Sequence, residues 1–479
     1  MNSSRKNFIK SMAIGASTAL SYPLIFKKAD ENSIEETTST TNSRAGSITV
    51  LNVKDFGAEG DGSTDDTQAI QRALSKSKTE QYEIVYVPDG IYHISEILVI
   101  YENTTLQLNR NAVIIRKADI NAMLINGTED VAGFDGQSNI TVQGGTWDGN
   151  SREFPSNVTP LGFGHARNIT VQNLTVLDVY NWHHVEINAI DGATIQDCLF
   201  DGMILTREYT EMVQIDLMGA EGMFPWFGKY DHTTCRNVLI NRCIFQNGDT
   251  AGIGTHSTRE DARHEYITIT NCEFINLKRE GIVAQNWQNV NIENNFFRKC
   301  NQGVFIEALS DTDCKDITIT KNKMLDLDLS ADSNAIQIHS EKSGSQIRHI
   351  LINGNFLSNI GSHGIEIDYC DYATIRNNTV KNCKKSGIWS NQSNNLSIAE
   401  NVAFNNATGE GSEDKDIRFN STEAEHITKN HIVTSNNIET CRIEAVDQCL
   451  LSNNIIKTEL VKDADCTGVN NYIKNEFYK

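Results

Sequence analysis

The 479-residue sequence predicts an all-β fold, a right-handed parallel β-helix with a short capping helix near its N-terminal end. Two recurring phrases and one isolated helical pattern lead to this fold class. The first phrase, apolar-x-x-(Cys or Asn)-x-apolar, returns from about residue 140 at intervals of roughly two dozen residues, which is the range of solenoid repeats. The second phrase has the period-2 alternation of a strand. Apolar residues at helical spacing occur only near residues 64–74.

The first phrase places the same residue types at one bend of successive coils. Its fourth position is occupied in turn by Leu174, Cys198, Cys243, Cys272, Asn295, Asn322, Asn355, Asn378 and Asn401. Asparagine amides repeated at a bend can stack from coil to coil and satisfy the backbone of the turn. A cysteine at this position is a small apolar filler. Although the cysteine count of 11 is odd and neighbouring coils would permit a disulfide, we expect at least these cysteines to be buried free thiols.

The second phrase forms strands whose alternate residues point outward in two columns. One column reads Glu186, Gln214, Gly254, Val283, Phe305, Gln337, Glu366 and Trp389. The other reads Asn188, Asp216, His256, Gln285, Glu307, His339, Asp368 and Asn391. Carboxylates, imidazoles and amides with almost no lysine are typical of a reactive groove. The alternative is an ordinary polar ladder that covers an exposed sheet.

Residues 52–74, NVKDFGAEGDGSTDDTQAIQRAL, predict a strand, a glycine turn and an amphipathic helix that begins at Asp65 or Asp66. A short helix of this kind can cap the open end of a solenoid. The stretch closely resembles the entry motif of the pectate lyase-like superfamily, whose members include polygalacturonase-like hydrolases, alginate-modifying enzymes and phage tailspikes. The repeats beyond it agree, so the resemblance covers nearly the whole mature chain. It implies the fold, but the superfamily also hosts plain binders and therefore implies no single activity.

The sequence departs from the two best-known groups of this superfamily. The Asn-Thr-Asp, Asp-Asp, Gly-His-Gly and Arg-Ile-Lys motifs of polygalacturonase-like hydrolases are not intact, and residues 252–257, GIGTHS, only faintly resemble the third. The Asp cluster and nearby Arg of calcium-dependent pectate lyases are also missing. No catalytic residue is carried over from either group.

The start of the chain predicts export. Residues 1–28 have a basic beginning and a short apolar run broken by Ser, Gly and Pro, which is typical of a signal similar to the twin-arginine type and too short for a membrane span. Residues 29–46 form a polar tether, and residues 47–479 form one β-helix domain. We expect a periplasmic or extracellular protein. The net charge of −20 argues against nucleic acid or an anionic membrane as partner.

An aromatic insertion and a group of histidines lie near the first outward strands. The insertion, residues 219–233, contains aromatic rings suited to stacking on sugars, and we expect Trp226 and Trp182 to contact a substrate. The alternative is a hydrophobic flap over the barrel side. Several of the 12 histidines fall close together in sequence: His165, His183, His184, His232, His256 and His264. Histidines grouped near carboxylates favour a functional site.

These residues favour a polysaccharide lyase that acts on a uronic acid-containing polymer such as a glycosaminoglycan, pectin or alginate. In β-elimination a base removes the proton beside the uronate, a donor neutralises the carboxylate and an acid protonates the leaving oxygen. We expect His256 or His184 to be the base and Tyr230 the acid. Asn188 or Gln214 would neutralise the carboxylate.

The predicted stacking adds distances. Asp216 would lie about 5 Å from His256 on the adjacent coil and raise the basicity of its imidazole. His165 would extend the same column one coil before Asn188. The diagonal from Glu186 to Asp216 would be about 8 Å, which also fits the carboxylates of an inverting glycoside hydrolase.

Glycoside hydrolysis by Glu186 and Asp216 is therefore the first alternative, and a non-catalytic glycan-binding or tailspike-like adhesin is the second. Imidazoles, amides and a phenol favour the lyase. Basic side chains that could contact a polyanion flank the groove, with ordinary surface charge as the alternative: Arg207, Lys229, Arg236, Arg259 and Arg263.

No cofactor is required by this chemistry. Glu307, His339 and Asp368 occupy three successive coils and could converge on a divalent cation such as calcium. Glu307 could instead contact the substrate in a long groove that also contains Gln337, His363 and Glu366.

Overall fold

The structure, a computed structural model, describes residues 49–478 apart from 79–80, 128–129, 205–209, 222–223, 227, 310–311, 329–332, 341–345, 410–413, 421–427, 445, 463–465 and 474–475. The export signal and tether predicted for residues 1–46 lie outside the described residues and stay predictions.

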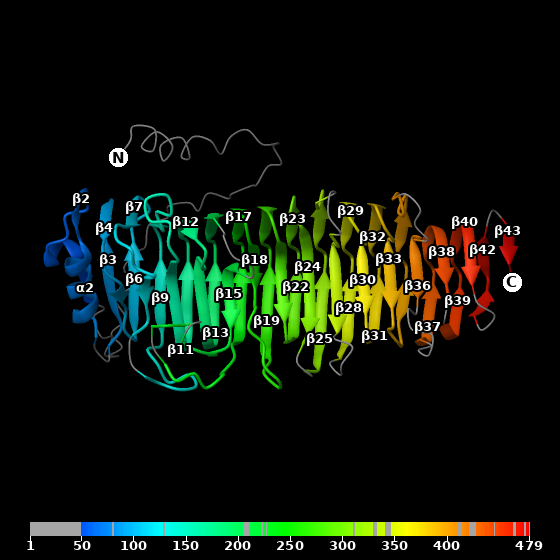
Figure 1. Cartoon of the computed structure of the whole chain (residues 1–479), viewed down its shortest axis with the longest axis horizontal. Coiled ribbons are helices and arrows are strands. Elements are labelled where there is room, and N and C mark those ends of the chain that lie inside the picture. Colours follow the sequence, from blue (N-terminus) through cyan, green and yellow to red (C-terminus); the bar gives the residue numbers. More distant parts are fainter. Residues whose placement is uncertain are drawn as a thin grey trace, which may run out of the picture. The chain divides into compact units, whose positions relative to one another are not determined.

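The strands stack coil on coil in three parallel ladders, which confirms the predicted parallel β-helix (Figure 1). Ladder A contains β5 (Leu98–Val99), β8 (Ala122–Ile125), β11 (Thr159–Gln172), β13 (Val185–Gln196), β15 (Glu211–Asp216), β18 (Ala251–Gly254), β21 (Glu280–Gln285), β24 (Gln302–Ala308), β27 (Ile336–Ser340), β30 (Ile365–Asp368), β33 (Ile388–Asn391), β36 (Ile417–Asn420) and part of β38 (Asn437–Ile443).

Ladder B contains β1 (Thr49–Asn52), β3 (Glu83–Val87), β6 (Thr104–Leu108), β9 (Ile140–Gln143), the later parts of β11 and β13, β16 (Arg236–Asn241), β19 (His264–Thr270), β22 (Trp287–Glu293), β25 (Cys314–Thr320), β28 (Ile347–Asn353), β31 (Cys370–Arg376), β34 (Ser397–Ala399), β37 (Thr428–Thr434), β39 (Val446–Ser452) and β41 (Cys466–Val469).

Ladder C contains β2 (Asp61–Asp65), β4 (Gly90–Ile94), β7 (Ala112–Arg116), β10 (Thr146–Asp148), β12 (Thr175–Tyr180), β14 (Leu199–Ile204), β17 (Ile244–Gly248), β20 (Glu273–Leu277), β23 (Phe296–Arg298), β26 (Lys323–Leu325), β29 (Phe356–Ile360), β32 (Thr379–Cys383), β35 (Val402–Phe404), the start of β38, β40 (Ile455–Lys462) and β42 (Asn471–Ile473), to which β43 (Glu476–Tyr478) adds antiparallel.

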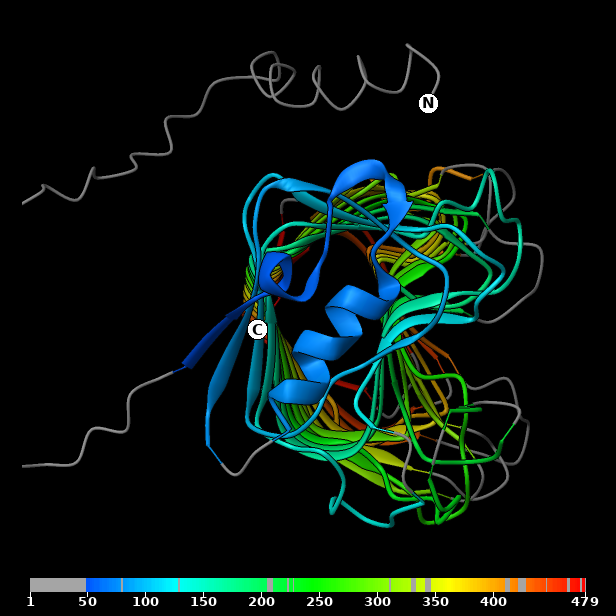
Figure 2. The ribbon, with the colours of Figure 1, turned by 90° about the vertical axis from the view of Figure 1, so that its left-hand side faces the viewer.

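A helix closes the N-terminal end of the stack, as predicted. After the 3-10 turn η1 (Val53–Phe56), helix α2 (Thr67–Lys76) lies across the end of the coils (Figure 2). Ile70 and Leu74 are fully buried on its inner face. The helix thereby shields the apolar interior that the first coil would otherwise expose.

The predicted asparagine ladder is present and continues to the last coils. In each step the side-chain oxygen of one asparagine accepts the backbone N–H of its counterpart one coil earlier, for example Asn322 Oδ1 from Asn295 N at 2.9 Å. The buried ladder comprises Asn295, Asn322, Asn355, Asn378, Asn401, Asn436, Asn454 and Asn471. These amides satisfy turn groups that would otherwise be unpaired in the interior.

The interior is filled by equivalent apolar side chains on successive coils. Phe200, Phe245, Phe274 and Phe297 form a continuous stack with centroid separations of 5.0, 4.9 and 4.6 Å. All 11 cysteines are buried and free, which confirms the thiols expected at Cys198, Cys243 and Cys272.

Removing one member of the ladder should destabilise the chain. Asn355→Ala deletes the acceptor for Asn322 N and the donor to Ile319 O, which lie at 2.9 Å each, and leaves both backbone groups buried without a partner. We expect a loss of about 1–3 kcal/mol in unfolding free energy, measured by urea denaturation. Asn353→Ala, on the partly exposed outer side of β28, is the control and should change stability by less than about 0.5 kcal/mol. Equal effects would contradict a specific role for the ladder.

The thiols should be unreactive in the folded protein. We expect Ellman's reagent to modify almost no cysteine under native conditions, because all are buried, and all 11 after unfolding in urea without reductant. A loss of thiols in pairs after unfolding would instead reveal disulfides.

Candidate active site

The register of ladder A confirms the two outward columns predicted from the sequence. Glu186 pairs with Gln214 and Asn188 with Asp216 on adjacent coils. Farther along, Gln285, Glu307, His339, Asp368 and Asn391 are successive partners. His256 is the exception to the predicted column, because β18 ends at Gly254 and the histidine lies beyond the end of this strand.

Glu186 is buried in a polar environment that favours its protonated form. Only 2% of the residue is exposed. Its carboxyl group accepts hydrogen bonds from Asn188 Nδ2 at 3.0 Å and from the Thr159 hydroxyl at 3.2 Å. Burial, followed by the charge of Asp216, raises the pKa of Glu186 to about 8.

Asp216 lies one coil away and is equally buried. Its carboxyl oxygens accept hydrogen bonds from Gln214 Nε2 at 2.8 Å and from the backbone N–H of Leu217 at 2.7 Å. Burial raises the pKa of Asp216 to about 7. Asn188 Oδ1 and Gln214 Oε1 are also buried, and within the described residues they have no hydrogen-bond partner.

His256 pairs with Glu211 instead of Asp216, which corrects the predicted partner. The distance from His256 Nδ1 to Glu211 Oε2 is 2.9 Å, and the His256 side chain is 20% exposed whereas Glu211 is 1% exposed. The ring of His183 stacks on His256 with centroids 5.8 Å apart. Burial opposes the ionisation of Glu211, but the charge of His256 and its hydrogen bond outweigh it and lower the pKa of Glu211.

These residues are named the carboxylate cluster: His183, Glu186, Asn188, Glu211, Gln214, Asp216 and His256. Sequence reasoning missed Glu211 and His183. A weak signal existed for Glu211, which begins the strand that also carries Gln214 and Asp216. For His183 the signal was its place beside His184. Which of these two adjacent histidines faces the cluster depends on the backbone conformation just before the strand begins.

The expected groove positions of His184 and His165 are wrong. His184 is fully buried, packs edge-on against Phe200 of the core, and has a pKa lowered to about 3 by burial. His165 is also fully buried at a corner with φ 49°. Its ring nitrogens lie 2.8 and 2.9 Å from the carbonyl oxygens of Gly133 and Lys229, and Gly164 takes the expected place beside Asn188.

The aromatic insertion packs over the coil that precedes the carboxylate cluster. Trp226 covers Gly162 and Phe224 covers Gly164, where a Cβ atom would approach each ring to 2.7 Å. Trp182 contacts Trp226 edge-on with centroids 6.1 Å apart. The insertion is therefore a packed flap, the alternative that the sequence left open.

Tyr230 belongs to this flap. Its hydroxyl donates to the carbonyl of Phe224 at 3.3 Å, and burial raises the pKa of Tyr230. No hydrogen bond links it to the carboxylate cluster within the described residues, so the structure does not support its expected role as the acid. Lys229 is exposed on the same segment.

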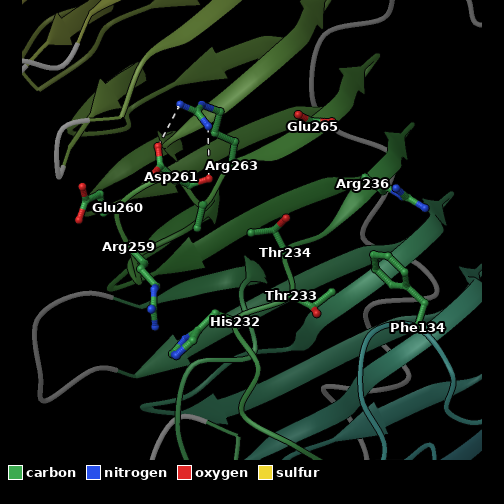
Figure 3. A pocket seen from close by; sticks show the side chains of 11 residues that line it. Phe134, His232, Thr233, Thr234, Arg236, Arg259, Glu260, Asp261, Arg263 and Glu265 are labelled. Carbon is green, nitrogen blue, oxygen red and sulfur yellow. Dashed lines mark hydrogen bonds and ion pairs between the residues drawn. The ribbon is translucent and has the colours of Figure 1, made fainter.

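A cavity of about 490 Å³, lined by three arginines and three acidic residues, lies between the end of the insertion and the loop that follows His256 (Figure 3). Arg259 and Arg263, expected to bind substrate, line it together with Arg236. Arg236 forms an ion pair with Asp191 at 2.9 Å, whereas Arg263 donates to the carbonyl of Asp313 at 2.6 Å. Arg207 lies outside the described residues.

Glu307, His339 and Asp368 were expected to converge on a divalent cation. In the structure each of them contacts another side chain of the same face. His339 Nδ1 lies 3.1 Å from Asp368 Oδ2, and Gln285 Nε2 donates to Glu307 Oε2 at 3.2 Å. Within the residues that the structure describes, no group of three or more His, Cys, Asp or Glu side chains is arranged to hold a metal ion.

The stacked ladders and their outward polar columns define a parallel β-helix protein with a buried acid–base cluster. The profile of the rhamnogalacturonase A/epimerase, pectate lyase-like family matches residues 50–323, and that of the right-handed β-helix region matches residues 261–422. The chain belongs to this pectate lyase-like family, which confirms the resemblance and the right-handed fold. Among the residues with described positions, no helix is both long and apolar enough to span a membrane.

Similar proteins include binding proteins and phage appendages. The chain is 29% identical over 287 residues to plasmin and fibronectin-binding protein A of Streptococcus pneumoniae, covering 52% of this chain and 39% of that protein. It is 27% identical over 272 residues to the pre-neck appendage protein of Bacillus phage B103, covering 54% and 27%. The match therefore spans less than half the length of either relative.

A solved structure shows the same fold. The crystal structure of PfbA, a surface adhesin of Streptococcus pneumoniae, has a TM-score of 0.65 at 23% identity, covering 79% of this chain and 93% of that one.

Replacing Glu186 should change how stability depends on pH. The folded chain holds the Glu186 proton to a pKa of about 8, whereas the ordinary value is 4.5, so the folded state binds more protons between these values and its stability falls as pH rises through them. Glu186→Gln mimics the protonated form. We expect it to exceed wild-type stability at pH 9 by at least about 1 kcal/mol and to match it at pH 5, measured by urea unfolding. Glu273→Gln, at an exposed site on β20, is the control, and a pH-independent difference would contradict the assignment.

Proposed function

We propose that the chain is an exported lyase that cleaves a uronic acid-containing polysaccharide by β-elimination at the carboxylate cluster. The observation that carries this proposal is the pair formed by His256, which reaches solvent, and the buried Glu211 carboxylate. An imidazole held by a carboxylate is a suitable base for a carbon-bound proton.

Each step has a group available. His256 takes the proton beside the uronate carboxyl group, the electron pair forms the new carbon–carbon double bond, and the bond to the leaving oxygen breaks. Asp216, with a pKa of about 7, supplies the proton to that oxygen. Glu211 is a positioning residue, because it acts through His256.

The protonated state of Glu186 makes the cluster compatible with an acidic sugar. At neutral pH a carboxyl group with a pKa of about 8 is uncharged and can donate to a uronate rather than repel it. The unpartnered oxygens of Asn188 and Gln214 favour a ligand that brings hydroxyl donors. Arg259, in the cavity formed by the loop that follows His256, would contact further acidic groups of the polymer.

Hydrolysis by Glu186 and Asp216 is less well supported. An inverting hydrolase needs one ionised carboxylate to activate water and one protonated carboxyl group. The pKa values of about 8 and 7 would suit these two roles, but this chemistry leaves the pair of His256 and Glu211 without a function.

A non-catalytic adhesin is the second candidate. Glu186 and Asp216 are only 2% and 1% exposed, and burial of this degree suits a structural cluster. The relative named as a plasmin and fibronectin-binding protein also favours a binding role at the cell surface.

The proposal is tested by ultraviolet absorbance during incubation with alginates, pectins and glycosaminoglycans, because elimination creates a conjugated unsaturated uronide. We expect absorbance to rise with at least one of them, and His256→Ala to lower the rate by about 10²–10⁴-fold. Glu211→Gln should lower the rate and shift its pH profile. His349→Asn, at an exposed histidine on β28 paired with Asp316, is the control and should remain active.

Two outcomes would contradict the lyase. New reducing ends without absorbance would indicate hydrolysis, and binding of a glycan with neither signal would indicate the adhesin.

A further inference from the structure

The C-terminal coils of ladder A carry a second group of polar and aromatic side chains, far from the carboxylate cluster. Asp216 and Asp368 belong to the same outward column, and five coil steps of about 4.8 Å separate them by roughly 24 Å. The group, named the distal face, consists of Phe305, Gln337, His339, Glu366, Asp368 and Trp389. The described contacts of the aromatic insertion lie on the coil of Gly162 and Gly164, and on the distal face the His339 side chain is 28% exposed.

Glu366 is held in a fixed position on this face. Its two carboxyl oxygens accept hydrogen bonds from Gln337 Nε2 at 2.9 Å and from Asn334 Nδ2 at 2.8 Å. The next outward residue of the same strand, Asp368, contacts His339 and accepts from Asn391 Nδ2 at 2.9 Å. Side chains locked in this way offer acceptors and donors at fixed spacing, which is how proteins select sugar hydroxyl groups.

Trp389 lies directly beside Glu366 on the next coil. Its indole stacks on His363 with centroids 4.8 Å apart and planes inclined by 13°, so the ring is rigid, and the residue is only half-buried. Within the described part of the chain its Nε1–H has no acceptor. That nitrogen is itself buried, so the indole offers a ligand its ring and not its N–H. A rigid, partly exposed indole next to fixed carboxyl and amide groups is suited to the flat face of a pyranose.

The charges around this face select against an acidic ligand. Glu307, Glu366 and Asp368 contribute carboxyl groups, and the nearby Arg418 forms an ion pair with Asp414 at 3.3 Å. Burial raises the pKa of Glu366 to about 7, so the like charge that a uronate or sulfate would meet here comes mainly from Glu307 and Asp368. The described cations beside them, His339 and Arg418, are paired with Asp368 and Asp414. A neutral sugar carries no such penalty.

We propose that the distal face is a second glycan-binding site, which stacks a neutral pyranose on Trp389 and holds its hydroxyls through Glu366, Gln337 and His339. The site is independent of the proposed lyase chemistry in residues and in ligand class. It would attach the protein to a neutral polysaccharide while the carboxylate cluster faces an acidic one.

The test is native affinity electrophoresis of the purified chain in gels containing soluble mixed-linkage β-glucan, xyloglucan or galactan, with alginate and pectate as acidic counterparts. We expect at least one neutral polymer to retard the wild-type chain and Trp389→Ala to weaken this retardation by about tenfold or more in affinity. Trp389→Phe retains a stacking ring and should bind at an intermediate level, which also controls for folding.

The matched control is Tyr372→Phe together with Tyr372→Ala, because Tyr372 is 55% exposed on β31 in ladder B and both variants should bind as wild type. Absence of retardation by every neutral polymer would overturn the proposal, as would equal binding by wild type and Trp389→Ala. Loss of alginate or pectate binding in Trp389→Ala would overturn the neutral ligand class. Uronate cleavage should be unchanged in Trp389→Ala and abolished in His256→Ala, so the two proposals can fail separately.

Discussion

Every feature of this protein depends on the stacking of each coil in register on the one before it. The asparagine ladder imposes that register, because each amide bonds both the backbone and the side chain of its counterpart, as Asn378 does with Asn355 at 2.9 and 3.0 Å. A slip by one residue would remove these bonds and exchange the interior and outward side chains of a strand. The ladder therefore fixes which residues face outward along the helix.

Stacking in register places residues that are far apart in the sequence next to one another in outward columns, so reactive side chains can gather at one place. Glu186 and Asp216 lie in separate strand phrases, yet stacking brings them close enough for the charge of Asp216 to raise the pKa of Glu186. The insertion then covers the coil beside them through Trp226 and Phe224. Low solvent exposure makes ionisation costly, so the pKa values rise, whereas Glu211 stays ionised because His256 compensates its charge.

The sequence predicted the side-chain positions correctly wherever the period-2 pattern was unbroken. The predictions were wrong at the corners between strands. The outward columns, the asparagine ladder and the buried thiols follow from repetition alone. His165 and Ala189 have left-handed backbone angles of 49° and 54° at corners of the coils, where the alternation of side chains is interrupted. His184 lies in the bend just before β13 begins at Val185, so counting by twos back from the strand selected His184 instead of its neighbour His183. The flap over the first coils could not be placed either, because its contacts are long-range and belong to no repeat.

The same outward face thus presents two environments with different consequences for a ligand. Near the insertion, burial raises the pKa of Glu186 and Asp216 to about 8 and 7, so Glu186 would offer a proton to the acidic sugar proposed there. On the distal face Asp368 is paired with His339 and more of the surface reaches solvent, and a neutral sugar is proposed to bind there. A solenoid can combine both because each coil contacts mainly its neighbours, and coils several steps apart can differ in charge without disturbing one another. The spacing between coils, rather than a second domain, separates the two proposed sites.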